Sequence, residues 1–413
     1  MLTRIEVKGF KTLADVAVDL GAVNVFIGAN GSGKSNLLEA IGFAGATAYA
    51  GLDVEFLHYR GIRLGSPASY LCALRAATSD QLSIKAYGER ASYSGRYGPE
   101  AAYPTRWAIH DESVEIYERN TIRRSVNGFE FQALDHTWLF PVPNHSPSLP
   151  IRDAVYGLNG GGSNGGRNPA DALAESFTLN TFLIALGQYA IFSPSTPYLR
   201  GVGGDVQREP LGLGGSGLGQ AIEQMTSTDP NAFGPFDLDE VFELIEWAND
   251  LRVDSGNREN GASQRSSIRI GDRFMNASHR AVSATEASEG ALYVLFLLAL
   301  AGHDLAPRLF AVDNFDQALH PRLASSLTRM ICDQIVKERS RQMFATTHNP
   351  LVLDGLDLLD DRIRLFTVER DSTGATQVQR ITVTEELMAQ ANKGMSLSEL
   401  WVMGRLGGVP KNL

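Results

Sequence analysis

The sequence predicts an α/β protein built around a phosphate-binding loop, and three observations carry that prediction. A glycine-rich segment, residues 28–35, follows one apolar run and precedes a helical pattern. A second apolar run, residues 309–312, ends at the acid Asp313. Another buried strand is expected at residues 342–347, and it ends at His348. Short buried strands that alternate with helices are typical of this fold class.

The first segment has a complete nucleotide-binding pattern. Residues 28–35 read Gly-Ala-Asn-Gly-Ser-Gly-Lys-Ser, which matches G-x-x-x-x-G-K-S/T. The glycines let the main chain wrap phosphates with its N–H groups, and the next helix adds the positive end of its dipole. Lys34 is expected to reach the β- and γ-phosphates, and the Ser35 hydroxyl to hold Mg²⁺. The sequence therefore predicts binding of a nucleoside triphosphate. The predicted contacts are Asn30, Gly31, Ser32, Gly33, Lys34, Ser35 and Asn36.

The ends of the later strands supply further candidates. Asp313 follows an apolar strand, as a second Mg²⁺-ordering carboxylate must. The imidazole of His348 can hydrogen-bond a γ-phosphate or an attacking water. Upstream, Ser288 and Gly290 form a Ser-x-Gly turn before an apolar helix, so another set of N–H groups is expected at a helix N-terminus.

In this order and spacing the four elements resemble the head of ABC-type ATPases. More closely, they resemble the branch of AAA-type ATPases that holds the structural-maintenance-of-chromosomes (SMC), RecF and overcoming-lysogenization-defect (OLD) proteins. The opening residues 2–13, Leu-Thr-Arg-Ile-Glu-Val-Lys-Gly-Phe-Lys-Thr-Leu, look like that branch's first strand. The resemblance covers residues 1–45 and 280–370.

This resemblance implies that two heads sandwich two ATP molecules with Mg²⁺. Lys34 and Asp313 of one subunit would then face Ser288 and Gly290 of the other. The expected assembly is a homodimer or a higher homo-oligomer, joined by ATP and released by hydrolysis.

One departure from the SMC pattern Asp-Glu-x-Asp-x-x-Leu-Asp bears on catalysis. Residues 313–320 read Asp-Asn-Phe-Asp-Gln-Ala-Leu-His, so Asn314 stands where the family has its catalytic glutamate. An amide can position a water but cannot accept its proton, and loss of a general base costs on the order of 10²–10⁴ in rate. Either Asp316 or His348 takes over this role, or hydrolysis is slow and the ATP-bound dimer persists.

The expected domain organisation follows from these motifs. Residues 1–45 and 280–385 would form the ABC-type ATPase core. Residues 46–156 contain alternating segments that predict antiparallel hairpins in an inserted β-rich lobe. Residues 157–279 are expected to hold a glycine-rich linker and a helical and hairpin insertion, and residues 386–413 a C-terminal helix and tail. The predicted fold is a P-loop, ABC-type head with a mixed sheet and, since no sustained heptads occur, no long coiled coil.

Composition limits the environment and the partners. A net charge of −10 argues against a uniformly basic nucleic-acid binder, although a local patch for DNA or RNA stays open. Cys72 and Cys332 have no ligand spacing and suggest buried thiols in a reducing cytosol. The N-terminus has no signal peptide, and the longest apolar run, residues 291–301, is too short for a bilayer. We therefore expect a cytoplasmic protein without a membrane partner.

Three features keep two interpretations each. The arginines before the Ser-x-Gly turn, here called the signature turn (Ser288 to Gly290), form either a phosphate-tracking strip or a solvated hairpin with acidic neighbours. Arg60 and Arg63 lie either near the nucleotide or on a surface turn. The helix around Trp401 either packs on the head or docks a partner. The arginines of the first group are Arg252, Arg258, Arg265, Arg269, Arg273 and Arg280.

The sequence lacks the acidic metal cluster of the Toprim nuclease that follows the ATPase in OLD proteins. The box at residues 313–319 and the C-terminal segment look similar to the stand-alone ATPases of bacterial anti-phage systems such as Septu. The resemblance implies an ATPase whose nucleotide-dependent dimer controls a separate effector, a nuclease or a toxin, in phage defence. A RecF-like repair or recombination ATPase that acts on DNA is the alternative. Asn314 adds a third possibility, a nucleotide-binding scaffold with almost no turnover.

Overall fold

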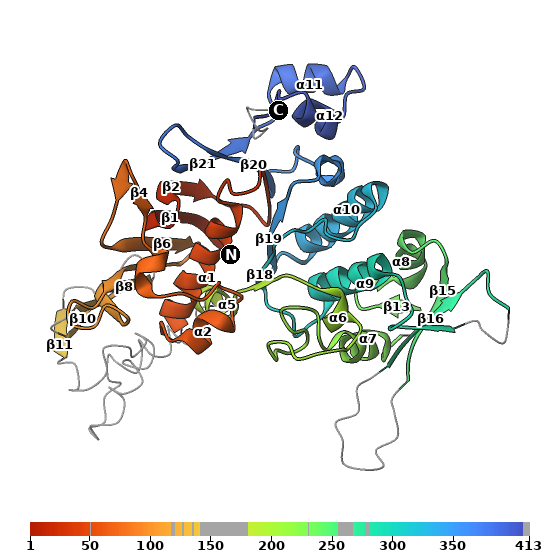
Figure 1. Cartoon of the computed structure of the whole chain (residues 1–413), viewed down its shortest axis with the longest axis horizontal. Helices are drawn as coiled ribbons and strands as arrows, with labels where there is room; N and C mark the ends of the chain where they lie inside the picture. Colours follow the sequence, from red (N-terminus) through yellow and green to blue (C-terminus); the bar gives the residue numbers. More distant parts are fainter. Residues whose placement is uncertain are drawn as a thin grey trace, which may run out of the picture.

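The computed structural model arranges the chain around two large sheets with helices between and beside them (Figure 1). It describes residues 1–49, 51–116, 120–125, 128–133, 136–140, 181–229, 231–254, 267–276 and 281–407.

The central sheet has six strands in the order β12-β18-β19-β3-β20-β21. All neighbouring pairs are parallel except β20–β21, which is an antiparallel hairpin. Strand β3 therefore has a parallel neighbour on each side, and both come from the last fifth of the chain. The strands are β3 (Val23–Ile27), β12 (Ala190–Phe192), β18 (Leu309–Val312), β19 (Gln342–Thr347), β20 (Ile363–Arg370) and β21 (Thr376–Ile381).

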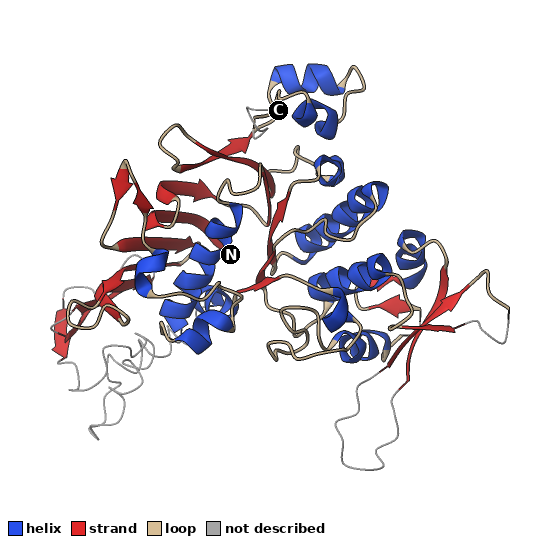
Figure 2. Cartoon of the chain, in the orientation of Figure 1, coloured by secondary structure: helices blue, strands red, loops and turns tan. Residues whose placement is uncertain are grey.

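Both faces of this sheet are buried. Successive side chains of a strand point to opposite faces, and every residue of β3 is buried. In β3, Val25 joins one hydrophobic cluster and Phe26 the other. Phe26 stacks on Phe366 of β20, with ring centroids 5.0 Å apart. The two clusters contain the helices that cover the two faces. Figure 2 shows these helices on either side of the central strands.

One face is covered by α1 (Lys34–Tyr49) and α5 (Thr181–Gln188), the other by α9 (Glu289–Gly302) and α10 (Pro321–Glu338). Glycines set the close approach of α1 to α5. A Cβ on Gly45 would lie 2.2 Å from the carbonyl oxygen of Leu186. Helix α9 is apolar on every side, as a helix enclosed by protein must be.

The second large sheet has eight strands in the order β11-β10-β9-β8-β7-β6-β1-β2, and every pair is antiparallel. The antiparallel hairpins expected in this region are present in the described residues between 82 and 140. Val7 of β1 pairs with Val16 on one side and Ile84 on the other, so these hairpins extend the sheet that the N-terminal strands begin. The strands are β1 (Leu2–Phe10), β2 (Leu13–Asp19), β6 (Leu82–Gly88), β7 (Ala91–Pro99), β8 (Trp107–Ile116), β9 (Asn120–Ser125), β10 (Gly128–Ala133) and β11 (His136–Phe140).

Smaller elements lie at the periphery. A three-stranded antiparallel sheet, β15-β16-β17, stands beside α8 at the right of Figure 1, and α11 and α12 lie at the top. The remaining elements include α2 (Val54–His58), β4 (Ala73–Leu74), β5 (Ala77–Thr78), α6 (Thr196–Leu199), α7 (Leu218–Thr226), β13 (Ala232–Phe233), β14 (Phe236–Asp237), α8 (Leu238–Leu244), β15 (Ala248–Asp254), β16 (Ser267–Asp272), β17 (Ala281–Ser283), α11 (Glu385–Ala391), α12 (Leu397–Val402) and 3-10 turns at Pro67–Tyr70 and Pro350–Gly355.

The predicted fold class is confirmed: the chain is α/β, with a mixed central sheet, an antiparallel β lobe and a helical insertion. In the described ranges the longest helix has 18 residues, and none forms a long coiled coil. None of the described helices has both the length and the apolar character needed to cross a membrane.

The expected division into domains stays a prediction, but two of its boundaries cut across sheets. The ATPase core was expected to end its first part at residue 45, yet β1 and β2 belong to the same sheet as β6–β8. Strand β12, inside the expected insertion 157–279, is an edge strand of the central sheet. Hydrogen bonds between strands determine which sheet a strand belongs to, and here they join segments that are distant in sequence.

Candidate functional site

The phosphate-binding loop connects β3 to α1 and lies under the β20–β21 hairpin. A Cβ on Gly28 would lie 2.1 Å from the carbonyl oxygen of Val368. Gly33 has φ +112°, and a Cβ there would lie 2.2 Å from Thr376 Oγ1. Side chains at these two positions would collide with the hairpin, so glycine is required for close packing as well as for backbone conformation.

The loop fits an anion. Gly31, with φ +74°, has only open space within 4 Å of its Cβ position. Within the described residues, no hydrogen bond uses the N–H groups of Gly31, Gly33 or Lys34, and the buried Ser32 hydroxyl also has no partner there. Unused donors at a helix N-terminus are a binding site for phosphate oxygens.

Lys34 is held across the mouth of this loop. Its ammonium group donates to the carbonyl oxygens of Gly28 (2.7 Å) and Ala29 (3.0 Å), and the residue is 7% exposed. Burial lowers the pKa of Lys34, while the carboxylates of Asp313 and Asp316 oppose that shift. The charge is thus enclosed and directed by loop carbonyls, close to where phosphates would lie.

Asp313 and Ser35, the expected metal ligands, are hydrogen-bonded to one another. The Ser35 hydroxyl donates to both carboxylate oxygens of Asp313, at 3.1 and 2.9 Å. Thr346, on the neighbouring strand β19, donates to the same carboxylate at 2.5 Å. Hydroxyl and carboxylate oxygens are ligands that Mg²⁺ accepts beside nucleotide phosphates, so this donor set fits Mg²⁺.

Asn314 occupies a conformation that suits asparagine. Its φ is +58°, in the left-handed region that Asn tolerates better than most residues. Its N–H donates to Thr346 Oγ1 at 2.9 Å, and its carbonyl accepts from the Tyr293 hydroxyl at 3.1 Å. The main chain is fixed, while the residue as a whole is exposed. An amide at this point can orient a water but cannot take up its proton.

Asp316 and His348 lie together, next to Asp313 and Ser35. Asp316 accepts a hydrogen bond of 2.6 Å from Thr347, and its side chain is 7% exposed. His348 Nε2 lies 3.8 Å from Asp316 Oδ2, with 55% of its side chain exposed. Both alternatives to the missing glutamate are therefore in one cluster, and a buried carboxylate beside an imidazole is a usable proton acceptor.

Ser288 and Gly290 lie elsewhere. The Ser288 hydroxyl accepts from the N–H of Ala291 at 3.3 Å and so caps α9. Both residues line a cavity of about 550 Å³ together with Trp247 and His320. None of the cavity's lining residues comes from the phosphate loop. Within one chain, the signature turn and the phosphate loop therefore do not line the same cavity.

Sequence reasoning missed a polar clamp behind the loop. Thr376 donates to the carbonyl oxygen of Ser32 at 2.8 Å and shares a 2.7 Å hydrogen bond with Thr12. Asn36 donates to Thr12 at 2.8 Å, and Arg370 donates to the carbonyl oxygen of Gly31 at 2.7 Å. No local sequence pattern predicts this clamp, because the β20–β21 hairpin brings Arg370 and Thr376 to the loop from a distant part of the sequence.

Arg63 and Arg60 have different surroundings. Arg63 donates to Asn36 at 2.8 Å and to Glu39 at 2.5 Å, so it lies against the helix that starts at the phosphate loop. Glu39, buried to 2% exposure, also pairs with Lys11. Arg60 is 2% exposed, so it does not lie on a surface turn.

The described arginines of the strip have partners of their own. Arg252 pairs with Asp250 at 2.8 Å and Arg269 with Asp254 at 3.0 Å. Arg273 donates to the carbonyl oxygen of Ala248. These contacts favour the solvated hairpin. The other members, Arg258, Arg265 and Arg280, lie outside the described residues.

The C-terminal helix packs on the head. In α12, Leu400 is buried, and Asp354 accepts hydrogen bonds from the N–H and the hydroxyl of Ser398 at 2.9 and 2.7 Å. Trp401 packs against the same hydrophobic cluster as α9 and α10. Of the two interpretations, packing on the head is the one that these contacts support.

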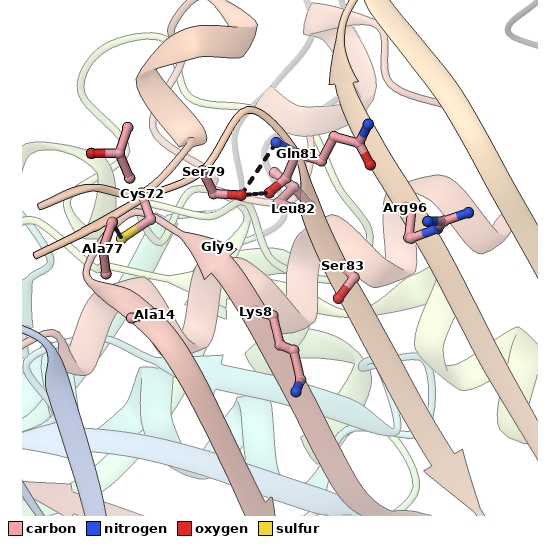
Figure 3. Close-up of a pocket in the computed structure, with 11 residues that line it drawn as sticks. Lys8, Gly9, Ala14, Cys72, Ala77, Ser79, Gln81, Leu82, Ser83 and Arg96 are labelled. Carbon is pink, nitrogen blue, oxygen red and sulfur yellow. Dashed lines mark hydrogen bonds between the residues drawn. The ribbon is translucent and has the colours of Figure 1, made fainter.

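A separate cavity of about 320 Å³ lies at one end of strands β1 and β6, beside the β4–β5 hairpin (Figure 3). Cys72 lines it, with its thiol donating to the carbonyl oxygen of Ala77, and Lys8 and Arg96 come from separate strands at its rim. No residue of the phosphate loop lines this cavity, so it is distinct from the candidate site.

Two family models match separate segments of the chain. Residues 1–48 match the family described as an AAA ATPase domain. Residues 231–354 match the family described as an AAA domain, putative AbiEii toxin, Type IV TA system. The first match contains Lys34 and Ser35, and the second contains Ser288, Asp313 and His348. No curated protein matches the chain at a significant level.

Solved structures that match the chain include SMC heads at low identity. The Smc head of Pyrococcus furiosus, with an extended coiled coil and bound to the C-terminal domain of ScpA, is 14% identical with a TM-score of 0.49; the alignment covers 95% of this chain and 99% of that one. The SMC head of Thermotoga maritima is 14% identical with a TM-score of 0.43, covering 92% and 99%. At these values the likeness bears on neither activity nor partners. The two family matches carry the conclusion: the chain contains segments similar to ATPase domains, and the candidate site is built from both.

Proposed function

We propose that the chain is an ABC-type ATPase that binds ATP and Mg²⁺ at the phosphate loop and hydrolyses ATP slowly. The observation that carries the proposal is the cluster of Lys34, Ser35 and Asp313. Loop carbonyls hold Lys34, and the hydroxyls of Ser35 and of Thr346 on the neighbouring strand donate to Asp313. Lys34 and the loop N–H groups bind phosphate oxygens, and Ser35 and Asp313 hold the metal. Bound Mg²⁺ supplies charge neutralisation at the phosphates.

Slow turnover follows from the residues that face the attacking water. Asn314 offers only an amide, so proton transfer falls to the Asp316–His348 pair. His348 is exposed, and at 3.8 Å from Asp316 it is beyond good hydrogen-bond distance. We infer that this pair becomes an efficient base only when its geometry tightens, as catalytic hydrogen bonds do on substrate binding.

The second half of the site is proposed to come from another copy of the chain. Ser288 and Gly290 present helix N–H groups away from their own phosphate loop, and Ser288 is exposed. Two copies that exchange these turns would enclose two nucleotides in a homodimer. ATP then acts as part of the interface, and its slow hydrolysis sets the lifetime of the dimer.

The proposed role of this dimer is to control a separate effector, a nuclease or toxin, in anti-phage defence. The family description for residues 231–354 names a toxin–antitoxin system, which supports a role beside a toxin-type effector. The described arginines of the strip carry acidic partners, which weakens the alternative of a RecF-like or SMC-like repair ATPase that tracks DNA phosphates.

Turnover and mass in solution test this proposal together. We expect little ATP hydrolysis by the purified protein and a dimer mass that appears with ATP and Mg²⁺ and persists. DNA would leave the rate unchanged. A monomer at all ATP concentrations would contradict the two-copy site, and rapid DNA-stimulated turnover would favour the repair ATPase.

A further inference from the structure

A second cavity, of about 460 Å³, lies at the far end of α1 from the phosphate loop. Lys34 begins this helix and Tyr49 ends it, roughly 24 Å away at 1.5 Å per residue. The cavity is enclosed by the ends of α1, α2 and α5 and by the segment around Arg208. Its size is within the range of small-molecule sites, about 300–1,000 Å³.

Two guanidinium groups line this cavity side by side. Arg60 donates to the carbonyl oxygens of Phe56 (3.0 Å) and Gly187 (2.5 Å). Arg208 donates to the carbonyl oxygens of Tyr59 (2.9 Å) and Gln188 (2.8 Å). These carbonyls belong to the C-terminal ends of α2 and α5, where helix dipoles favour cations. A guanidinium has five N–H donors, so each arginine keeps three after these two bonds.

Neither guanidinium lies within ion-pair distance of a carboxylate in the described part of the chain. Arg60 is nevertheless 2% exposed, and its Nε is buried without a partner in that part of the chain. Burial, and then the charge of Arg208, lowers the pKa of Arg60 to about 10. Glu55 and Glu209 also line the cavity, but both are exposed at its rim. A buried guanidinium that has no ion-pair partner and lies beside a second, partly exposed guanidinium is costly, and an anionic ligand would relieve that cost.

Aromatic rings form the rest of the wall. Tyr59 is 42% exposed and Phe56 is 36% exposed, so part of each ring is open to a ligand. The Arg208 guanidinium covers one face of the Tyr59 ring, 4.3 Å from its centroid. Exposed rings beside cations suit a flat ligand that carries a negative group.

We propose that this cavity binds a small aromatic anion of the nucleoside monophosphate class. The phosphate contacts the guanidinium groups of Arg60 and Arg208, and the base packs on the rings of Tyr59 and Phe56. The exposed carboxylates of Glu55 and Glu209 can accept hydrogen bonds from an exocyclic amino group. The site is separate from the phosphate loop and does not depend on the proposed ATPase activity.

Titration with AMP tests the site in protein that carries Lys34→Ala, which weakens nucleotide binding at the phosphate loop. We expect saturable binding of one AMP per chain by calorimetry, and weaker binding of both adenosine and inorganic phosphate. Arg208→Gln should weaken AMP binding at least about tenfold, because a charge-assisted hydrogen bond is lost. The absence of AMP binding up to about 5 mM, or adenosine binding as tightly as AMP, would overturn the proposal.

A second pair of variants avoids the buried arginines. Leu305 is 61% exposed and lines the cavity. Leu305→Glu adds a negative charge at the rim and should weaken AMP binding, whereas Leu305→Gln, of matched size, should not. Both variants should keep the unfolding temperature of the parent, since the side chain is mostly in solvent. Equal AMP affinity in the two variants would argue against an anion in this cavity.

Discussion

Around Lys34 and Asp313, side chains from several strands and helices hold one another, whereas around Ser288 a single capping bond orders an exposed turn. Lys34 is 7% exposed and donates to two loop carbonyls, and Asp313 accepts from two hydroxyls. Ser288 caps its own helix and lines an open cavity. A site that is complete within one chain needs such a network. A turn that meets a ligand only in another copy must stay accessible.

The two regions also differ in the free-energy cost of burying their polar and charged groups. The phosphate-loop half buries a cation, which is unfavourable unless polar partners surround it, and loop carbonyls and nearby carboxylates supply those partners. The signature half leaves its helix N–H groups in solvent, where water satisfies them. Four changes, in order of expected effect, test this difference.

The largest expected effect is on turnover. Asn314→Glu supplies the absent carboxylate and should raise the rate of ATP hydrolysis by on the order of 10²–10⁴. Because φ at this position is +58°, a glutamate also costs roughly 1 kcal/mol of stability. Phosphate release and thermal unfolding measure the two effects. Asn314→Gln carries the same strain without a base, and a rate gain in it would refute the explanation.

Nucleotide affinity is the next test, and it addresses the enclosed half. Lys34→Ala removes charge-assisted hydrogen bonds to phosphate and should weaken ATP binding by about 10–100-fold. Calorimetry with ATP and Mg²⁺ measures this change. Lys337→Ala, on the surface of α10, is the control and should bind as the parent does. Unchanged affinity in Lys34→Ala would remove the basis of the site.

Assembly tests the exposed half. Ser288→Arg puts a long side chain into the turn and should weaken ATP-dependent dimerisation by about tenfold or more, since one blocked central contact costs upwards of about 1.4 kcal/mol. ATP affinity of the monomer should stay within about twofold. Sedimentation with and without ATP measures the mass. If Ser288→Arg lowers monomer affinity as much as Lys34→Ala does, the turn acts within its own chain.

The smallest effect concerns backbone strain in the segment that links the halves. Ala318 has φ +66° and its carbonyl oxygen lies against Gly290. Ala318→Gly relieves roughly 1 kcal/mol of strain, partly offset by the extra freedom of glycine in the unfolded chain. The free energy of unfolding should rise by about 0.5 kcal/mol in urea. A decrease would mean that the methyl group contributes packing.

Much of this site is predictable from the sequence because its motifs are local. The phosphate loop is one continuous segment, and Asp313 follows directly on a strand. The partners of Asp313 are different in kind. Parallel pairing of β18 with β19 matches Val312 with Ala345, so the next residues, Asp313 and Thr346, become neighbours. That pairing joins segments 30 residues apart and has no signature in either.

The division of the chain into lobes was harder to predict for the same reason. The hairpins of residues 46–156 have a clear alternating pattern, and their strands were expected. Nothing in that pattern says that Ile84 pairs with Val7 and so continues the N-terminal sheet. The clamp at Thr12 and Thr376 is likewise a product of topology, since 364 residues separate its two hydroxyls.

The position of β3 between β19 and β20 has a consequence for synthesis in the cell. The strand that carries the phosphate loop is made early, but both of its neighbours begin only at Gln342 and Ile363. At about 5–20 residues per second, a ribosome needs roughly 15–60 s to make the intervening chain. During that time an apolar strand with two unpaired edges is exposed on the nascent polypeptide. We therefore expect a chaperone to bind the N-terminal segment and to be released once β20 emerges and the central sheet can form.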